Sequence, residues 1–166
     1  MLIGIIGWKN AGKTTLACSL IRTLTQQGLR VGSIKHSHHG LSALSTQGDS
    51  IRHKEAGAVP AILIAADAWM IDDRLQVGCP PPLDDMLVKF SDVDLVLIEG
   101  FKAATHAKIE VRREAFAGAP LAPCDAQIFA IVTDSPDRYG PLVHFTHNEI
   151  DAIAELILAR MEKGSA

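Results

Sequence analysis

The sequence predicts an α/β fold in which a mostly parallel β-sheet is flanked by helices. The main observation is a set of short apolar segments that are continuous rather than alternating, as in strands buried on both faces. Segments with a helical spacing of apolar residues lie between several of these runs, and strands that alternate with helices form parallel sheets. The apolar runs are residues 2–6, 31–34, 61–65, 93–98 and 128–132.

Four segments are expected to be helices. The clearest begins at residue 14 and carries Leu16, Leu20 and Leu24 on one face. It precedes Gly28, a residue type that commonly ends helices. The expected helices are residues 14–27, 50–56, 82–90 and 148–161.

Residues 69–72 and 108–113 are expected to add a β-hairpin region or edge strands to the sheet. Residues 77–82 and 115–123 are rich in Gly, Pro and Ala, which is typical of loops. No boundary divides the chain, so residues 1–166 are expected to form a single domain.

Composition limits the classes of partner. The chain has 166 residues, 48% hydrophobic and 21% charged, so it can bury a core. Its net charge of -3 argues against nucleic acid or an acidic membrane surface as a partner, and any anion site is expected to be local. No apolar run reaches the roughly 18 residues that a membrane-spanning helix needs, so no membrane partner is expected.

Three cysteines, Cys18, Cys79 and Cys124, stand at unrelated spacings, and no Cys-x-x-Cys pair is present. This pattern favours reduced cysteines and argues against a zinc cluster. The first apolar run follows no charged segment and breaks at Gly7, so no signal peptide is expected. Together these features predict a cytoplasmic protein.

The strongest motif is Gly7-x-x-x-x-Gly12-Lys13-Thr14, which matches the P-loop pattern at every fixed position and predicts a P-loop NTPase-like fold. An expected strand precedes it and an expected helix follows. Main-chain N–H groups and the helix N-terminus then bind phosphate. Lys13 is expected to reach the β- and γ-phosphates, and the Thr14 hydroxyl to bind Mg²⁺. The alternative is a Gly-rich turn without a ligand.

The other residues of the loop have lesser roles. The main chain at Asn10 and Ala11 is expected to line the phosphate site, and Thr15 to donate to an α-phosphate. Lys9 has two interpretations that the sequence does not separate, a second phosphate contact and a solvated lysine.

A second signal is the strand that ends in Glu99 and Gly100. An acid at the carboxyl end of a parallel strand stands at the ligand edge of the sheet. We therefore expect Glu99 to hold Mg²⁺ through water or to orient an attacking water, the alternative being a charge that merely ends a strand. Asp94 is expected to be a solvent-exposed residue at the start of this strand.

A third signal is a basic cluster after the second strand, formed by Lys35, His36, His38 and His39. It predicts an anion contact, and period 2 places His36 and His38 on one face. A zinc site would need a further ligand, and none is evident, so exposed loop histidines are the other interpretation. Asp49 is expected to cap the next helix, and a role as a second magnesium carboxylate is compatible with that.

With these residues in place, the chain resembles the MobB family, molybdopterin-guanine dinucleotide biosynthesis protein B. The similarity runs from the P-loop to about Arg112 and is weaker over residues 131–136. Its landmarks are GWKNAGKTT, GLRVGSIKHSHH, GDS followed by RHKEAGA, DLVLIEGFK and KIEVRR.

The resemblance implies a P-loop fold of the dimerising ATPase and GTPase type. Members of the family bind GTP with Mg²⁺ and hydrolyse it weakly. They assist a MobA-type nucleotidyltransferase, which joins GMP to molybdopterin to form the guanine dinucleotide cofactor. The expected partners are therefore GTP, molybdopterin or its guanine dinucleotide, a MobA-type enzyme and a second copy in a homodimer.

The resemblance also implies roles for matching positions. The P-loop residues Gly7, Gly12, Lys13, Thr14 and Thr15 are implied to bind phosphate and Mg²⁺. Asp49 and Glu99 are the acidic partners of the metal. Phe101 and Lys102 lie at the rim of the cleft. Lys35 and the three following histidines line the cleft. The chain departs from the family where it reads Gly40-Leu-Ser-Ala-Leu-Ser45 and Gln47, in place of acidic residues and a lysine, which bears on how the loop closes over the ligand.

Guanine selection requires an acid that accepts from the base, in a loop after a late strand. Asp134 has this character within Ile131-Val-Thr-Asp-Ser-Pro136. It is equally interpretable as a turn former before Ser-Pro.

A small-molecule or nucleotide kinase is the alternative from another class. Such kinases usually carry arginines in a lid over the phosphates, whereas residues 75–83 and 115–123 contain none. The accessory interpretation is therefore favoured, with at most slow Mg²⁺-dependent hydrolysis. Arg52, Arg112 or Arg113 of a second subunit could act on phosphate, but the favoured interpretation of all three is as surface salt-bridge residues.

Overall fold

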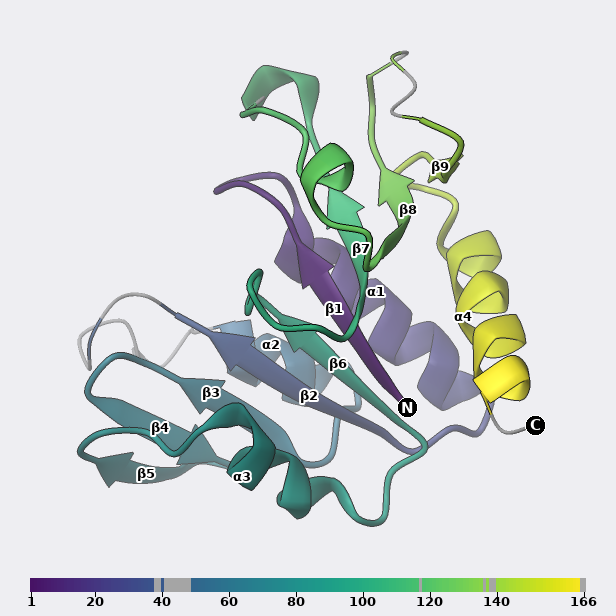
Figure 1. The fold of residues 1–166 in the computed structure, drawn as a ribbon. Coiled ribbons are helices and arrows are strands. Elements are labelled where there is room, and N and C mark those ends of the chain that lie inside the picture. The colour runs from purple at the N-terminus through teal and green to yellow at the C-terminus, as the bar shows by residue number, and fades with distance from the viewer. Residues whose placement is uncertain (38–39, 41–48, 117, 136, 138–139, 165–166) are drawn as a thin grey trace.

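A computed structural model describes residues 1–37, 40, 49–116, 118–135, 137 and 140–164. Within them one nine-stranded sheet has the order β5-β4-β3-β2-β6-β1-β7-β8-β9 (Figure 1). The strands are β1 (Leu2–Ile6), β2 (Val31–His36), β3 (Ala61–Ile64), β4 (Ala68–Ile71), β5 (Arg74–Val77), β6 (Leu95–Glu99), β7 (Ala107–Val111), β8 (Ile128–Val132) and β9 (Val143–Phe145).

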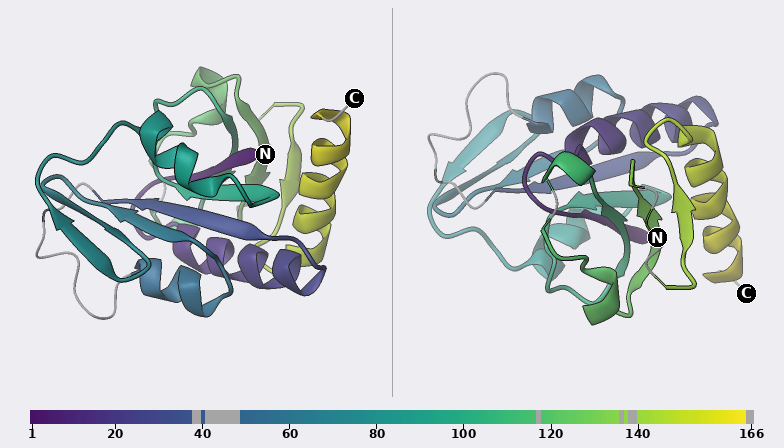
Figure 2. Two further views of the ribbon diagram at one scale, coloured as in Figure 1. Left: turned by 90° about the horizontal axis from the view of Figure 1, so that it is seen from below. Right: turned by 90° about the horizontal axis from the view of Figure 1, so that it is seen from above.

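Helices cover both faces of this sheet. Figure 2 shows α1 and α2 on one face and α3 on the other, with α4 beside α1. The helices are α1 (Lys13–Gln26), α2 (Asp49–Glu55), α3 (Leu83–Leu87) and α4 (Ile150–Gly164). Short 3₁₀ turns are η2 (Val88–Phe90), η3 (Glu114–Phe116) and η4 (Ala122–Cys124). No helix in the described ranges has the length and apolar character needed to cross a membrane.

The parallel character expected from the continuous apolar runs is confirmed. Neighbouring strands from β3 through β2, β6, β1, β7 and β8 to β9 all pair in parallel. Within β6, Leu95 and Leu97 pack in the cluster that contains α1 and α4, while Val96 and Ile98 pack in the cluster that contains α3. Both faces are buried, so both sets of positions are apolar.

The expected hairpin is confirmed for residues 69–72. They lie largely in β4, which pairs antiparallel with β3 and with β5 at the sheet edge. The sequence did not predict β5 because all four of its residues are exposed and carry no burial pattern. The short strand β9, with three residues, was also missed.

The expectation that residues 108–113 form a hairpin or an edge strand is wrong. They lie mostly in β7, an interior strand paired in parallel with β1 and β8. Lys108 and Glu110 alternate with apolar residues, a pattern typical of a strand with one solvent-exposed face, yet both are buried. Lys108 Nζ lies 2.7 Å from Asp125 Oδ2, and Arg112 Nη1 donates to Glu110 Oε1 at 3.0 Å. Pairing lets these charges occupy an interior strand.

Gly32 marks a close approach in β2. A Cβ at this position would lie 2.3 Å from Phe90 Cδ1, so Gly32→Ala must displace the ring. We expect a loss of about 1–3 kcal/mol in the free energy of unfolding, the usual cost of overpacking, as measured by urea denaturation. Gly164→Ala is the control, because no atom lies within 4 Å of its Cβ position. Equal stability of the two variants would contradict the packing argument.

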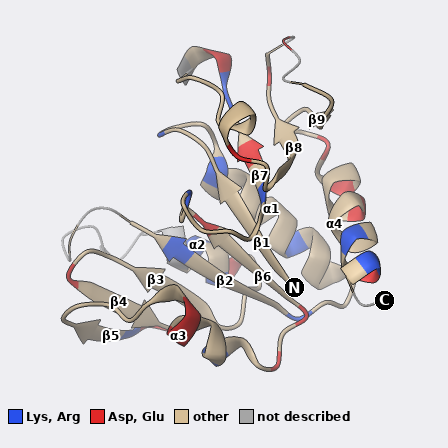
Figure 3. Ribbon diagram, in the orientation of Figure 1, with Lys and Arg blue, Asp and Glu red and all other residues tan. Residues whose placement is uncertain are grey.

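Acidic and basic residues are interspersed along the described strands and helices in the view of Figure 3, in keeping with the small net charge of -3. An anion would therefore be recognised by a local arrangement, which the segment between β1 and α1 supplies.

Candidate phosphate-binding site

The segment between β1 and α1 has the backbone of a phosphate loop. Asn10 and Gly12 have φ angles of 63° and 95°, and Gly12 caps the N-terminus of α1. Left-handed residues within such a turn make successive N–H groups converge on a concave surface that suits anions. The first turn of α1 contains no acidic residue, so the positive end of the helix dipole is not neutralised there.

Gly7 is required by the neighbouring strand. Its φ is 151°, and a Cβ there would lie 2.1 Å from the carbonyl oxygen of Val111 in β7. The loop therefore leaves β1 tightly against β7. Ala11 is 1% exposed and packs in the core, so its side chain anchors the loop. It is not among the residues that line the cleft, and its N–H donates to the Trp8 carbonyl at 3.3 Å.

Two lysines lie in or beside the phosphate loop. Lys13 is partly exposed, and its Nζ donates to the carbonyl oxygen of Trp8 at 2.8 Å, which keeps the ammonium beside the loop. Lys9 is exposed and lines the same cleft, so its position is compatible with both interpretations given above.

Most of the expected residues lie around one cleft of about 670 Å³. It opens at the carboxyl ends of β1, β2 and β6, the usual ligand edge of a parallel sheet. The lining residues are Gly7, Lys9, Asn10, Gly12, Lys13, Thr14, Thr15, Lys35, His36, Ser37, Arg52, Glu99, Gly100, Phe101 and Lys102. His38 and His39 lie outside the described residues, as does the side chain of Asp49, whose main chain begins α2.

Glu99 is the centre of a buried polar cluster. It is 2% exposed, and Thr14 Oγ1 lies 3.0 Å from each of its carboxylate oxygens. Lys35, its register partner on β2, forms an ion pair with Oε1 and lies 3.5 Å from Thr14 Oγ1. His53 Nε2 lies 3.4 Å from Oε2. Thr14 and Glu99, two of the three expected magnesium ligands, are thus adjacent.

These groups fit Mg²⁺. The ion takes hard oxygen ligands and commonly binds through one or two carboxylates, waters and substrate phosphates. The Thr14 hydroxyl and the Glu99 carboxylate supply such oxygens next to the phosphate loop.

The cluster also sets the charge of the acid. Burial by itself would raise the pKa of Glu99, but the adjoining His53 ring and the Lys35 ammonium outweigh it and lower the pKa from 4.5 to about 2. Glu99 is therefore a carboxylate at any physiological pH, as a metal ligand must be.

This depressed pKa predicts a loss of stability in acid. A carboxylate with a lower pKa in the folded state stabilises above its unfolded pKa of 4.5, and the contribution fades as pH falls toward about 2. Between pH 6 and pH 3 the expected loss from Glu99 is about 2 kcal/mol. Urea denaturation of the wild type and of Glu99→Gln measures it, because the variant lacks this titration. Parallel pH profiles for the two proteins would contradict the account.

The cleft rim combines aromatic and basic side chains. The rings of His36 and Phe101 stack with centroids 4.4 Å apart. Lys102 Nζ lies 4.2 Å from the centroid of the Trp8 ring, a cation–π geometry. The end of β2 and the segment after β6 therefore lie beside the phosphate loop at the mouth of the cleft.

Asp134 lies away from this cleft lining, after β8. Its Oδ1 accepts from the Glu114 N–H at 2.8 Å, and Arg113 Nη1 lies 3.5 Å from its Oδ2. The Thr133 hydroxyl, not Asp134, accepts the N–H of Ser135. Asp134 therefore ties the end of β7 to the end of β8, and its role toward guanine stays a prediction.

Sequence reasoning missed two residues of α2. Arg52 was interpreted as a surface salt-bridge residue but lines the phosphate cleft, whereas His53 is fully buried against Glu99. Arg113 does form an exposed ion pair, and Arg112 forms one that is buried. The sequence did carry a hint, because neighbouring residues such as Arg52 and His53 project from a helix in different directions. One of them can therefore face the cleft while the other is buried.

Comparison with known proteins agrees with this geometry. A sequence profile described as Molybdopterin guanine dinucleotide synthesis protein B matches residues 2–134. The chain belongs to the MobB family. It is 38% identical over 137 residues to a molybdopterin-guanine dinucleotide biosynthesis adapter protein of Haemophilus influenzae, covering 81% of this chain and 75% of the relative.

Other MobB relatives cover almost the whole chain. The adapter protein of Escherichia coli is 29% identical over 173 residues, covering 98% of this chain and 94% of the relative. The crystal structure of a MobB homologue from Bacillus stearothermophilus is similar with a TM-score of 0.63 at 22% identity, over 98% of both chains. The shared fold confirms the expected P-loop NTPase-like class.

Proposed function

We propose that this chain is a GTP-binding adapter that assists the guanylylation of molybdopterin. The observation that carries the proposal is the adjacency of the phosphate loop, Thr14 and Glu99 in a chain of the MobB family. The adapter role follows the names of the relatives in Haemophilus influenzae and Escherichia coli.

In this proposal the chain's own groups hold the triphosphate. Main-chain N–H groups of residues 7–15 and the Lys13 ammonium bind the β- and γ-phosphates, and Thr15 reaches the α-phosphate. Thr14 and Glu99, with Asp49 as a second acid, hold Mg²⁺, which neutralises phosphate charge when bound. Lys9, Lys35, His36 and Lys102 add positive or polar contacts around the anion, and His38 and His39 extend this wall.

Hydrolysis is expected to be slow. Arg52 lies in the cleft lining but on the exposed side of α2, and Glu99 is engaged by Lys35 and Thr14. Glu99 is therefore not free to orient an attacking water, and we expect the chain to bind GTP rather than turn it over rapidly.

The finer features belong to the same proposal. Asp134 accepts from the guanine base, the partner is a MobA-type nucleotidyltransferase, and the adapter acts as a homodimer. Cys18, Cys79 and Cys124 are not joined in a disulfide, which suits the reducing cytoplasm. Sedimentation of the purified chain tests the dimer independently of nucleotide binding.

One experiment separates the adapter from the kinase alternative. The melting temperature and phosphate release are measured with Mg²⁺ and GTP, with Mg²⁺ and ATP, and with Mg²⁺ alone. Selective stabilisation by GTP, with release well below the roughly 1–100 per second of kinases, supports the adapter. Rapid phosphate transfer to a small acceptor that survives Glu99→Ala would refute it.

A further inference from the structure

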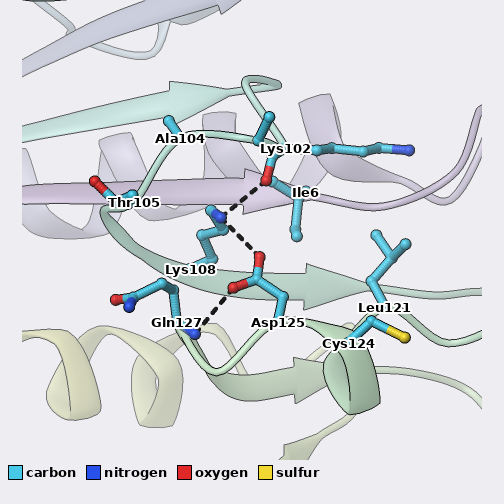
Figure 4. Close-up of a pocket in the computed structure, with 10 residues that line it drawn as sticks. Ile6, Lys102, Ala104, Thr105, Lys108, Leu121, Cys124, Asp125 and Gln127 are labelled. Carbon is cyan, nitrogen blue, oxygen red and sulfur yellow. Dashed lines mark hydrogen bonds and ion pairs between the residues drawn. The ribbon is translucent and has the colours of Figure 1, made fainter.

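A second cavity of about 390 Å³ lies on the sheet face opposite α1. Its floor includes Ile6, which packs with Ile131 and Leu121, whereas Ile5 packs against α1. Figure 4 shows the cavity between the segment after β6 and the turn η4. Its lining is Ile6, Lys102, Ala103, Ala104, Thr105, Lys108, Leu121, Cys124, Asp125 and Gln127.

This cavity is next to the phosphate cleft but separate from it. Lys102 lines both, and its ammonium points to the Trp8 ring of the phosphate loop. The segment after β6 is therefore the wall between the two sites. A ligand in each would place its functional groups on either side of one short stretch of chain.

Hydrogen bonds and an ion pair hold the polar side chains of this cavity in place. Lys108 is 1% exposed, and its Nζ donates to the Lys102 carbonyl at 2.9 Å and to Asp125 Oδ2 at 2.7 Å (Figure 4). Asp125 Oδ1 accepts the Gln127 N–H at 3.0 Å. Each carboxylate oxygen has two lone-pair directions, so both oxygens retain capacity for one more donor.

Asp125 faces the cavity as an anion. Its side chain is 22% exposed, and although burial alone would raise its pKa, the hydrogen bond from Lys108 and that from the Gln127 N–H lower it. Its charge is balanced by the buried Lys108, so the wall presents hydrogen-bond acceptors without strong net charge. The lining also includes the apolar side chains of Ile6 and Leu121.

We propose that this cavity binds the 2-amino-4-oxopyrimidine edge of a pterin ring. The ring N3–H and the 2-amino group are two parallel donors, which match the two oxygens of Asp125 in a bidentate contact. The flat body of the ring then covers Ile6 and Leu121. Guanine carries the same edge, so the two sources are separated by experiment. The proposal rests on the function proposed above, because it assigns a place to the pterin substrate beside the nucleotide.

The test uses the thiol of Cys124 as a reporter. Cys124 lines the cavity, and both it and Cys79 are exposed, whereas Cys18 is buried. In the native chain, oxidised biopterin is expected to slow alkylation of Cys124 by iodoacetamide about tenfold at about nine times its Kd. Cys79, outside the cavity lining, should react at an unchanged rate.

Two further ligands give the readout its specificity. Lumazine replaces the 2-amino group by an oxygen, so it should protect Cys124 far less than biopterin. Protection by guanosine rather than by biopterin would support the same edge contact with a guanine base as its source. Absence of protection by both biopterin and guanosine, or equal protection by lumazine, would overturn the proposal.

Two variants distinguish this proposal from the proposed function. Asp125→Asn should lose protection by biopterin and retain the rise in melting temperature with GTP, which also reports that it folds. Lys13→Ala should do the reverse. If Asp125→Asn stays protected, the proposal fails. If the variant does not fold, the comparison of biopterin with lumazine on the native chain decides. Stabilisation by GTP without protection by biopterin or guanosine rejects only the second site.

Discussion

Lys13→Ala is expected to abolish the stabilisation that GTP and Mg²⁺ give to this chain. At a GTP concentration about 100 times Kd, the wild type should gain about 2.7 kcal/mol, or roughly 5–10 °C in Tm for a chain of this size. The variant should gain almost nothing at the same concentration, because the ammonium is the principal point charge on the β- and γ-phosphates. Differential scanning fluorimetry with and without nucleotide measures the change.

The fold should survive this substitution. Lys13 is partly exposed and its Nζ donates to the Trp8 carbonyl, so the variant without ligand is expected to unfold within about 1 kcal/mol of the wild type. Lys89→Ala is a matched control, because Lys89 is an exposed lysine on η2 outside the cleft lining. If Lys13→Ala retains the full rise in Tm with GTP, the phosphate loop is not where GTP binds.

Glu99→Ala is expected to destabilise the chain even without nucleotide. Glu99 is 2% exposed and neutralises Lys35, whose side chain is 14% exposed. Removing one partner of a buried ion pair leaves the other charge uncompensated, which typically costs about 3–5 kcal/mol. Urea denaturation at neutral pH measures this loss. Asp94→Ala on the approach to the same strand should cost much less, because Asp94 pairs with Arg30 in solvent.

A double variant separates the structural role of Glu99 from its role toward metal. Glu99→Leu with Lys35→Met replaces the pair by apolar side chains, a change that is often close to neutral for stability. We expect this protein to recover most of the stability that Glu99→Ala loses and to gain much less than the wild type when Mg²⁺ is added to GTP. If Mg²⁺ adds as much to the effect of GTP as it does in the wild type, Glu99 is not a metal ligand.

The sheet was predictable where burial alone determined residue type. The runs that became β1, β2, β3, β6 and β8 are mostly apolar because these strands pack against core on both faces. The strand β7 broke this rule, since Lys108 and Glu110 are buried with partners from distant parts of the chain, Asp125 and the N–H groups at the start of η4. Pairing of this kind leaves no periodic pattern in the sequence.

The site, like the sheet, was predictable only where its residues are determined by local sequence. A motif specifies Gly7, Gly12, Lys13 and Thr14 because the phosphate loop is local in sequence. The position of Glu99 followed from strand direction alone. The contact of His53 with Glu99 depends on how α2 packs against the sheet, which residue spacing does not encode, and its burial was therefore not predicted.

The central claim is that main-chain amides between β1 and α1 hold the triphosphate of GTP. A crystal structure with a non-hydrolysable GTP analogue and Mg²⁺ tests it most directly. The account predicts the β-phosphate within the loop from Gly7 to Thr14 and the metal on the Thr14 hydroxyl near Glu99. An analogue bound elsewhere, with this loop free of phosphate, would contradict the account.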